Sequence, residues 1–518
     1  MALPVAPFFK RSLVRDCRQG RTYLERGGLL VATLICLMSA HAVAAFLGAP
    51  GLQLLSSITG LNAFLILLAG PSLFASVVTE EKEDMTLGLV KMTGLGSLWI
   101  LLGLSVGRLL TACMLLLAQV PFVVLAVALG GVSHLQVIAA YCALAAHLIF
   151  ISCLGLLCST VCKRTRRAAS LCVALILGFF LVPWAVGEWI KATVAGGVVA
   201  KGGFVDSVFG GLCELARDAS VFTRIGEVLT TGFSGSPIGF QVLADVGAAA
   251  LLFLLSWALF NRCTREEGTP APGRGGSFGL GGRLRRLGMG RAWRNALAWH
   301  GFYFTAGGKA MMVVKFALYA ALLAGICAIS SAAGDPLDRK EFGTVAMSMG
   351  LALVCLELAV CHGRAFGEER KSRTLVSIML IPASTHGIVY RKMLGCLLGM
   401  APALSLFCLG VVVFPDGFAE ALGTTVTEPA AWCGVAWFVL FCQLTALFSV
   451  LLRRGGLLLA FVVSYFGIQL VSVLIIMFFG LISSVQFGLL MVALVNAAAA
   501  VVAHKLALRL LERAAGRE

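Results

Sequence analysis

Long apolar runs alternate with short polar segments along the whole chain. Twelve runs have membrane-spanning length, near residues 27–48, 57–79, 101–129, 136–162, 168–190, 241–261, 311–331, 343–363, 390–414, 429–452, 457–480 and 486–511. About 20 consecutive apolar residues in a helix cross a hydrocarbon core roughly 30 Å thick. The pattern therefore predicts an all-α polytopic membrane protein with about 12 transmembrane helices.

The basic residues are concentrated in alternate loops between these runs. They gather at residues 10–26, 163–167, 262–294, 364–392, 453–454 and 505–517. Because loops rich in Lys and Arg stay in the cytoplasm, we expect the N- and C-termini both to be cytoplasmic. The net charge of +16 is then a consequence of topology, and no nucleic-acid partner is expected.

The composition excludes a soluble globular protein. Hydrophobic residues make up 59% of the chain and charged residues 13%, which is more apolar surface than a soluble core needs. The 17 cysteines lie mostly in the apolar runs and include no CxxC pair, so no metal site or disulfide framework is expected. Cys158 and Cys162, one helical turn apart, could bind a soft metal such as Cu(I), but packing is the simpler interpretation.

One charged segment occurs twice, each time after the second run of a set of six. The copies consist of Glu80, Glu81, Lys82, Glu83, Thr86 and Leu87, and of Glu368, Glu369, Arg370, Lys371, Thr374 and Leu375. Thr86 and Thr374 are 288 positions apart. In a second match, Ser159 precedes Lys163 by four residues and Ser449 precedes Arg453 by four. The chain is therefore predicted to contain two parallel six-helix repeats, related by an axis along the membrane normal.

The repeats divide the chain into three predicted parts. Residues 1–261 form the first six-helix unit and residues 291–518 the second. Residues 262–290, rich in Gly, Pro and Arg, form a cytoplasmic linker. Each unit begins with a basic segment that contains apolar residues and is predicted to lie on the membrane surface as an interfacial helix. Another amphipathic helix is predicted from Val205 to Ala216, in the long outer connection after the fifth run.

The repeated segment resembles part of the permease subunits of ABC-2 type transporters, which have the exporter-like fold also called type V. The pattern of that family is E-[KR]-x-x-G-T-L, then T-P-[LI]-S, then Gly-Lys at the start of the third span. The second copy continues with Ile381-Pro382-Ala383-Ser384 and, 18 residues after Thr374, with Lys392. The resemblance extends over the whole chain, and this motif is its specific part.

Both copies depart from the family pattern. The first has Thr93-Gly94-Leu95-Gly96 at the Thr-Pro-Leu-Ser position, and its basic residue, Arg108, lies one turn beyond the Gly-Lys position. Neither copy has Gly before Thr-Leu, because Met85 and Arg373 stand there.

The resemblance implies that each copy is a coupling helix that docks into a cytoplasmic ATPase subunit. Its contact residues would be Glu80, Glu81, Lys82, Glu83, Thr86, Leu87, Glu368, Glu369, Arg370, Lys371, Thr374, Leu375 and Lys392. We also expect Leu87 and Val90 to form an apolar edge that seats against protein or lipid. The alternative is an ordinary charged inner loop whose acidic residues happen to repeat.

The chain has no phosphate-binding loop of the form GxxxxGK[ST]. We therefore expect a permease that is not itself an enzyme and binds no cofactor, with ATP and Mg held by two copies of a partner ATPase. The resemblance implies a multi-pass protein of a bacterial-type cytoplasmic (inner) membrane, in contact with its lipids. The sequence does not identify the transported substrate.

Ionisable residues within the apolar runs are candidates for function. Glu357 lies in the eighth run, followed by His362 and Arg364 towards its inner end. These three residues form a candidate polar site, in which we expect Glu357 to line the substrate path or to couple the ATPase to that path through a polar network with Arg364. The alternative is a structural ion pair near the cytoplasmic interface. Amide and imidazole side chains such as Asn62, Gln119 and His147 are expected to make hydrogen bonds between helices.

Two other functions are compatible with parts of the sequence. An ion-coupled secondary transporter can also have 12 spans in two parallel halves, and its coupling residues would be Glu357 and His362. An intramembrane protease of the rhomboid type has a GxSG sequence, which occurs here at residues 232–235. That sequence lies in the predicted outer connection and does not begin a buried helix, which argues against a protease.

Overall fold

The computed structural model describes most of the chain, and every element in the described part is a helix. The described residues are 27–38, 40, 50–195, 203, 205–230, 233–264, 292–332, 337–364, 377–378, 380–381, 383–451, 456–457, 459–465, 467, 471, 475 and 485–517. The N-terminal basic segment, most of the linker and the second copy of the repeated motif lie outside these residues.

The protein is a multi-pass, all-helical membrane protein. Within the described residues, nine helices are long and apolar enough to cross a membrane, and there are ten if one bent pair counts as a single span. These ten coincide with ten of the twelve predicted runs. The first predicted run contains the shorter apolar helix Gly27–Met38, and most of the eleventh lies outside the described residues.

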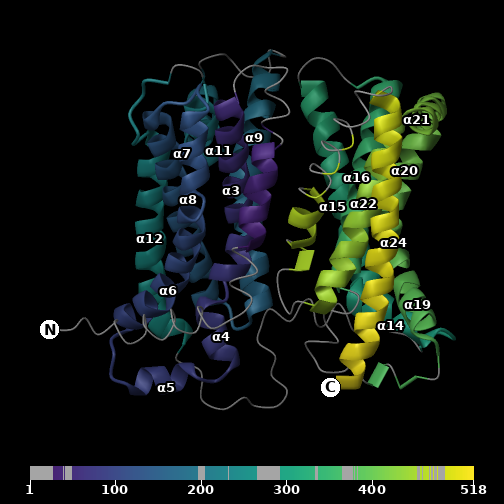
Figure 1. Ribbon diagram of the computed structural model, residues 1–518, viewed down its shortest axis with the longest axis horizontal. Helices are drawn as coiled ribbons and strands as arrows, with labels where there is room; N and C mark the ends of the chain where they lie inside the picture. The colour runs from purple at the N-terminus through teal and green to yellow at the C-terminus, as the bar shows by residue number, and fades with distance from the viewer. Residues whose placement is uncertain are drawn as a thin grey trace. The chain divides into compact units, whose positions relative to one another are not determined.

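The chain folds as two compact units, and Figure 1 shows the helices of each. The first unit contains the chain up to Pro272 apart from residues 191–198, which group with the second. Its helices are α3 (Pro50–Phe74), α4 (Val77–Glu83), α5 (Leu87–Met92), α6 (Ser97–Leu117), α7 (Val120–Ala128), α8 (His134–Val161), α9 (Thr165–Ala195), η1 (Val205–Gly210), α10 (Gly211–Asp218), α11 (Val221–Val228) and α12 (Phe240–Cys263).

The second unit begins at Gly273. Its helices are α14 (Ala296–His300), η2 (Gly301–Thr305), α15 (Gly308–Ala332), α16 (Arg339–Arg364), α19 (Thr385–Leu398), α20 (Ala401–Val413), α21 (Pro415–Thr427), α22 (Pro429–Leu451) and α24 (Val485–Arg517). Within this unit α16 packs against α20, and α22 packs against α24.

Helix α8 organises the first unit. It contacts α3, α12, α11, α4 and α6. Its side chains Leu144, Leu148 and Ile151 belong to a buried apolar cluster that also contains Phe74. At its N-terminal end Ser133 and Gln136 form a reciprocal capping box, and this end also contacts the connection between α9 and α12.

That connection contains the amphipathic helix predicted from Val205, realised as the consecutive helices η1 and α10, and a further helix, α11. Val221 and Ile225 of α11 are buried in the same apolar cluster as α8. The Gln136 side chain donates hydrogen bonds to the carbonyls of Val228 (3.2 Å) and Thr230 (2.9 Å). The connection is therefore part of the packed unit at the N-terminal end of α8.

The third span of each unit is interrupted close to a proline. Helix α6 gives way to α7 at residues 118–119, just before Pro121. Helices α19 and α20 meet at 59°, with Pro402 in the first turn of α20. Proline has no N–H for the preceding turn and restricts the residue before it. The predicted runs 101–129 and 390–414 are therefore each made of two helical pieces.

A glycine permits the close approach of α3 and α8. A Cβ atom added at Gly155 would lie 2.5 Å from Cβ and 2.9 Å from the carbonyl carbon of Phe74. The contacted atoms belong to the backbone or lie next to it, so a side-chain rotation cannot relieve the clash.

We expect Gly155→Ala to lower the free energy of unfolding by about 1–3 kcal/mol through overpacking. Gly178→Ala is the matched control, because a Cβ atom at Gly178 in α9 meets nothing within 4 Å and alanine favours a helix. Thermal unfolding of both variants in detergent tests this, and equal stability of the two variants would contradict it.

Candidate functional site

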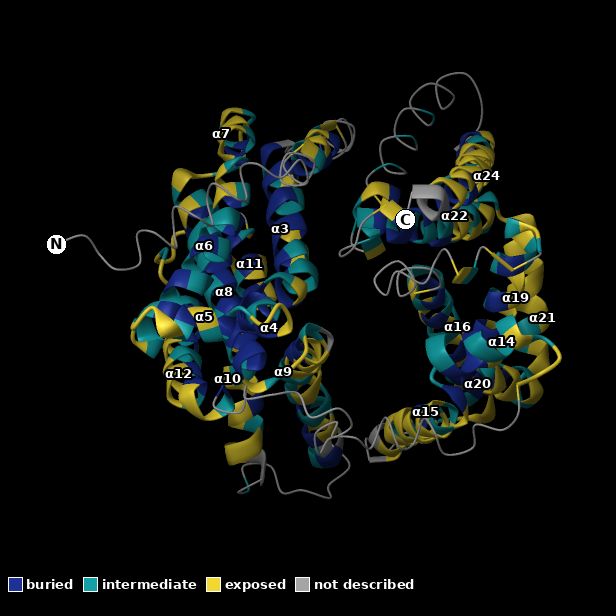
Figure 2. Ribbon diagram, turned by 90° about the horizontal axis from the view of Figure 1, so that it is seen from below, coloured by how far each residue is buried: buried dark blue, intermediate teal, exposed yellow. Residues whose placement is uncertain are grey.

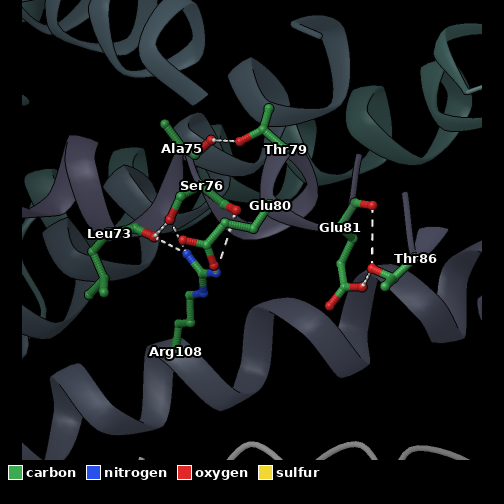
Figure 3. A network of polar contacts seen from close by, with 8 residues as sticks. All are labelled: Leu73, Ala75, Ser76, Thr79, Glu80, Glu81, Thr86 and Arg108. Atoms are coloured by element: carbon green, nitrogen blue, oxygen red, sulfur yellow. Dashed lines mark hydrogen bonds and ion pairs between the residues drawn. The ribbon is translucent and has the colours of Figure 1, made fainter. Parts of the chain in front are cut away.

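The first copy of the repeated motif forms a tight elbow between α4 and α5. The Thr86 N–H donates to the carbonyl of Glu81 (3.0 Å), and the Thr86 hydroxyl donates to the Glu81 carboxylate (Figure 3). Between them Met85 has φ of 57°, a left-handed conformation that costs a residue with a side chain about 1–2 kcal/mol. The hydrogen bonds between Glu81 and Thr86 thus stabilise the turn.

Lys82 is buried and binds the end of α8. Its ammonium donates to the carbonyls of Thr160 (2.6 Å), Cys162 (3.1 Å) and Ser159 (3.3 Å). These carbonyls belong to the last turn of the helix and its cap, where no N–H of the same helix is available. The positive charge also complements the negative end of the helix dipole. Lys82 therefore stabilises the C-terminus of α8.

Glu83 binds the start of the next span. Its carboxylate accepts a hydrogen bond of 2.7 Å from the backbone N–H of Thr165, the first residue of α9. A carboxylate at this position satisfies a free N–H and favours the positive end of the helix dipole. Lys82 and Glu83 thus join α4 to the consecutive helices α8 and α9.

Glu80 forms an ion pair with Arg108 of α6 at 2.5 Å. The Arg108 guanidinium also donates to the carbonyl of Leu73 (2.6 Å) and to the hydroxyl of Ser76 (Figure 3). Leu73 and Ser76 lie at the interruption between α3 and α4. Arg108 therefore links the third span to this interruption as well as to Glu80.

The apolar side chains of the elbow face in two directions. Leu87 and Val90 are buried in a cluster with Val78, Ile100 and Phe260. The expected apolar edge therefore seats against the unit itself. The exposed apolar side chains of the elbow are Met85 (60% exposed), Leu89 (66%) and Met92 (85%). Figure 2 shows exposed residues along α5.

Helix α5 has the compact form expected of the segment. It lies crosswise at the end of the long helices in Figure 1. It ends at Met92, and Gly94 follows with φ of 76°. This left-handed glycine ends the helical segment before α6 begins.

Of the second copy of the motif, residues Glu368 to Leu375 lie outside the described residues. Lys392 lies in α19 and is 1% exposed. The backbone around it is tightly packed, because a Cβ atom at Gly395 would clash with the carbonyl of Ala298 in α14. The segment predicted to be the second interfacial helix, α14 and η2, thus packs on α19.

Glu357 is the centre of a polar cluster in the second unit. Its carboxylate pairs with the Lys315 ammonium at 2.6 Å and accepts a hydrogen bond of 2.5 Å from the Tyr319 hydroxyl. Lys315 also donates to the carbonyl of Gly399 (3.2 Å), which lies at the bend between α19 and α20. The cluster therefore connects α15 and α16 to the interrupted third span.

In the structure Glu357 has partners other than Arg364, the partner that the sequence suggested. The His362 imidazole bonds to the carbonyl of Leu358 in its own helix (2.8 Å). Arg364 is exposed at the end of α16. Lys315 and Tyr319 are the partners that the sequence interpretation missed, although a lysine within an apolar run is itself an unusual feature.

A neutral polar cluster lies at the interruption of the third span in the first unit. The Asn62 amide donates to the Gln119 side-chain carbonyl (2.5 Å), and the Gln119 amide donates to the Thr33 hydroxyl (3.2 Å). Gln119 is fully buried at residues 118–119, between α6 and α7. Asn62 and Gln119 thus make the interhelical hydrogen bonds predicted for them.

His147 also bonds across helices, to a partner that the sequence interpretation missed. Its Nδ1 lies 3.3 Å from a carboxylate oxygen of Asp245 in α12, and both side chains are buried. Gln241 donates to the same carboxylate. Among the described residues no group of three His, Cys, Asp or Glu side chains is placed to hold a metal ion.

The sequence matches no protein-family model and no curated protein. Any function proposed for the chain therefore rests on the residues described above.

We expect Met85→Gly to stabilise the protein by about 0.5–1 kcal/mol. Glycine adopts the left-handed conformation without steric cost. The free energy gained by removing that cost exceeds the entropic cost of ordering glycine, which is more flexible than methionine in the unfolded chain. Met92→Gly is the control, because Met92 is also exposed but lies in helix α5, where glycine destabilises. Unfolding in detergent measures both, and destabilisation by Met85→Gly would contradict the assignment of the turn.

Lys315 and Glu357 are expected to be energetically coupled. Each replacement by Met leaves the other group buried without its partner, so the double variant should lose less stability than the sum of the singles, by about 1 kcal/mol or more. The more exposed pair Arg217 and Glu188, with side chains 33% and 39% exposed, provides the control cycle, with an expected coupling below about 0.5 kcal/mol. Equal coupling in the two cycles would show that the Lys315–Glu357 pair is energetically unimportant.

Proposed function

We propose that this chain is the membrane-spanning permease subunit of an ATP-driven transporter of the ABC-2 type, and that it exports its substrate. Its two six-helix units are parallel, with both termini and the repeated motifs on the cytoplasmic side of a bacterial-type inner membrane. ATP and Mg bind to a separate cytoplasmic ATPase, present as two copies. The permease itself supplies the path and the contacts, without chemical catalysis.

The observation that carries this proposal is the elbow of α4 and α5. A lever that transmits force from a partner must be compact, must be joined to the spans it moves and must expose a face for the partner. Lys82, Glu83 and Glu80 join the elbow to α8, α9 and α6. The exposed face consists of Met85, Leu89 and Met92.

The conformation of Met85 adds support for the resemblance. The ABC-2 pattern has glycine at this position, and a turn with positive φ explains physically why glycine would be preferred there. Met85 adopts that conformation without being glycine. The first copy thus departs from the pattern in sequence while keeping the backbone that the pattern favours.

The interrupted third spans support the proposed repeat. In the first unit the Gln119 side chain, at the interruption, bonds to Asn62 and Thr33 of the two preceding helices. In the second unit Lys315 of α15 bonds to Gly399 at the interruption and to Glu357 of α16. The chemistry differs, since the first cluster is neutral and the second is charged. We infer that the two halves make unequal contributions to the substrate path.

The buried pairs Lys315–Glu357 and His147–Asp245 favour a second candidate, an ion-coupled secondary transporter. Ionisable groups within spans carry proton or ion coupling in that class. Such a transporter has no need of the elbow, which makes the ATP-driven permease the stronger proposal. Purification from the native membrane in mild detergent separates the two, because a phosphate-loop ATPase accompanies only the permease.

The docking face is tested by Leu89→Asp and Met92→Asp in one chain. Charges on a face that contacts the ATPase should abolish most co-purification and the associated ATPase activity, while thermal unfolding stays unchanged because both side chains are exposed. Mass spectrometry of the copurified proteins provides the measurement.

The control is Leu422→Asp in α21, a helix with no buried residue on the predicted outer side, where retention of the ATPase is expected. Reversal of Glu80 or Glu83 is less informative, since these residues hold the unit together. A chain that comes alone and without ATPase activity even before substitution would support the secondary transporter.

A further inference from the structure

The first unit has an open cavity at the same end as the elbow. It has a volume of about 450 Å³ and lies among α5, α6 and α12, with Lys91, Ser97, Arg262, Leu95, Ile100 and Phe260 in its lining. The cations come from different helices, Lys91 from α5 and Arg262 from the last turn of α12. Among the described residues that line the cavity, none is acidic.

The two cations of this cavity are available for an anion. The Lys91 ammonium donates to the carbonyl of Thr264 (2.8 Å) and lies 5.6 Å from the Phe260 ring centroid, which fixes its position while using one of its three N–H donors. Arg262 is exposed, and within the described residues it has no acidic partner. The first turn of α6 also contains no acidic residue.

The position of the cavity indicates a ligand that comes from the bilayer. Trp257 of α12 is 43% exposed and donates to the Ser97 hydroxyl (3.1 Å), and tryptophan gathers where hydrocarbon meets headgroups. Leu251 and Leu254 lie one or two turns before Trp257 in α12. Both side chains are exposed, which is typical of residues that face lipid. Arg262 lies beyond Trp257, towards the end that the positive-inside rule assigns to the cytoplasm.

We propose that this cavity binds the phosphate headgroup of an anionic glycerophospholipid. Lys91 and Arg262 neutralise the phosphate, the Ser97 hydroxyl donates to it, and Leu95 contacts the glycerol and upper acyl chain. Basic pockets between helices on the cytoplasmic side suit such headgroups. The lipid would then sit against α5 and bear on the elbow, independently of whether an ATPase docks there.

The test is native mass spectrometry of the purified, delipidated full chain titrated with dioleoyl-phosphatidylglycerol or dioleoyl-phosphatidylcholine. The wild type should retain phosphatidylglycerol in preference. Lys91→Gln with Arg262→Gln should weaken that retention about tenfold. Arg164→Gln with Arg167→Gln removes the same charge from the same end of the unit and should leave retention unchanged.

Two further variants distinguish a loss of lipid binding from a loss of folding. Arg262→Gln alone replaces an exposed residue, so its effect on lipid retention does not depend on folding, and Lys91→Arg should preserve both the bond to Thr264 and the lipid. Equal retention of the two lipids, or equal loss in both double variants, would overturn the proposal. Displacement of the lipid by excess inorganic phosphate, with the same dependence on Lys91 and Arg262, would assign the site to a free phosphate instead.

Discussion

Backbone polar groups that lie away from water must find partners inside the protein, and this constraint explains most of the charged contacts in the structure. Lys82, Lys91 and Lys315 all donate to carbonyls at a helix end or bend, as Arg108 does at the interruption of α3 and α4. The Glu83 carboxylate instead accepts a hydrogen bond from a backbone N–H at the start of α9. Where these groups are buried, as the carbonyls bound by Lys82 are, leaving them without a partner would cost free energy.

The same constraint gives the repeated motif a structural meaning. Its charges occur together because the elbow lies where α4 ends, α8 ends and α9 begins, so that one short segment can satisfy free groups of several helices. In the first unit the motif meets the second internal match, since Lys82 bonds to the carbonyl of Ser159. Two sequence features separated by about 80 residues are thus in direct contact with each other.

Hydropathy along the chain was sufficient to predict the ten candidate spans among the described residues, because membrane burial depends on local composition. The prolines near the interruptions of the third spans were also visible in the sequence. Partners across helices were not, because they depend on how helices pack: Glu357 pairs with Lys315 of α15 and not with Arg364 of its own helix. The apolar edge of Leu87 and Val90 was predicted, but its partners Val78, Ile100 and Phe260 could not be, for the same reason.

The internal role of the motif charges determines how the proposed lever would work. If all of them faced the partner, the elbow would be attached to the unit only by its chain connections, and a push on α5 would bend those connections. Instead Glu80, Lys82 and Glu83 fix α4 to three other spans, and Leu87 fixes α5 to their apolar core. A displacement of α5 would therefore move the ends of α6, α8 and α9 together, which is the property that coupling to an ATPase requires.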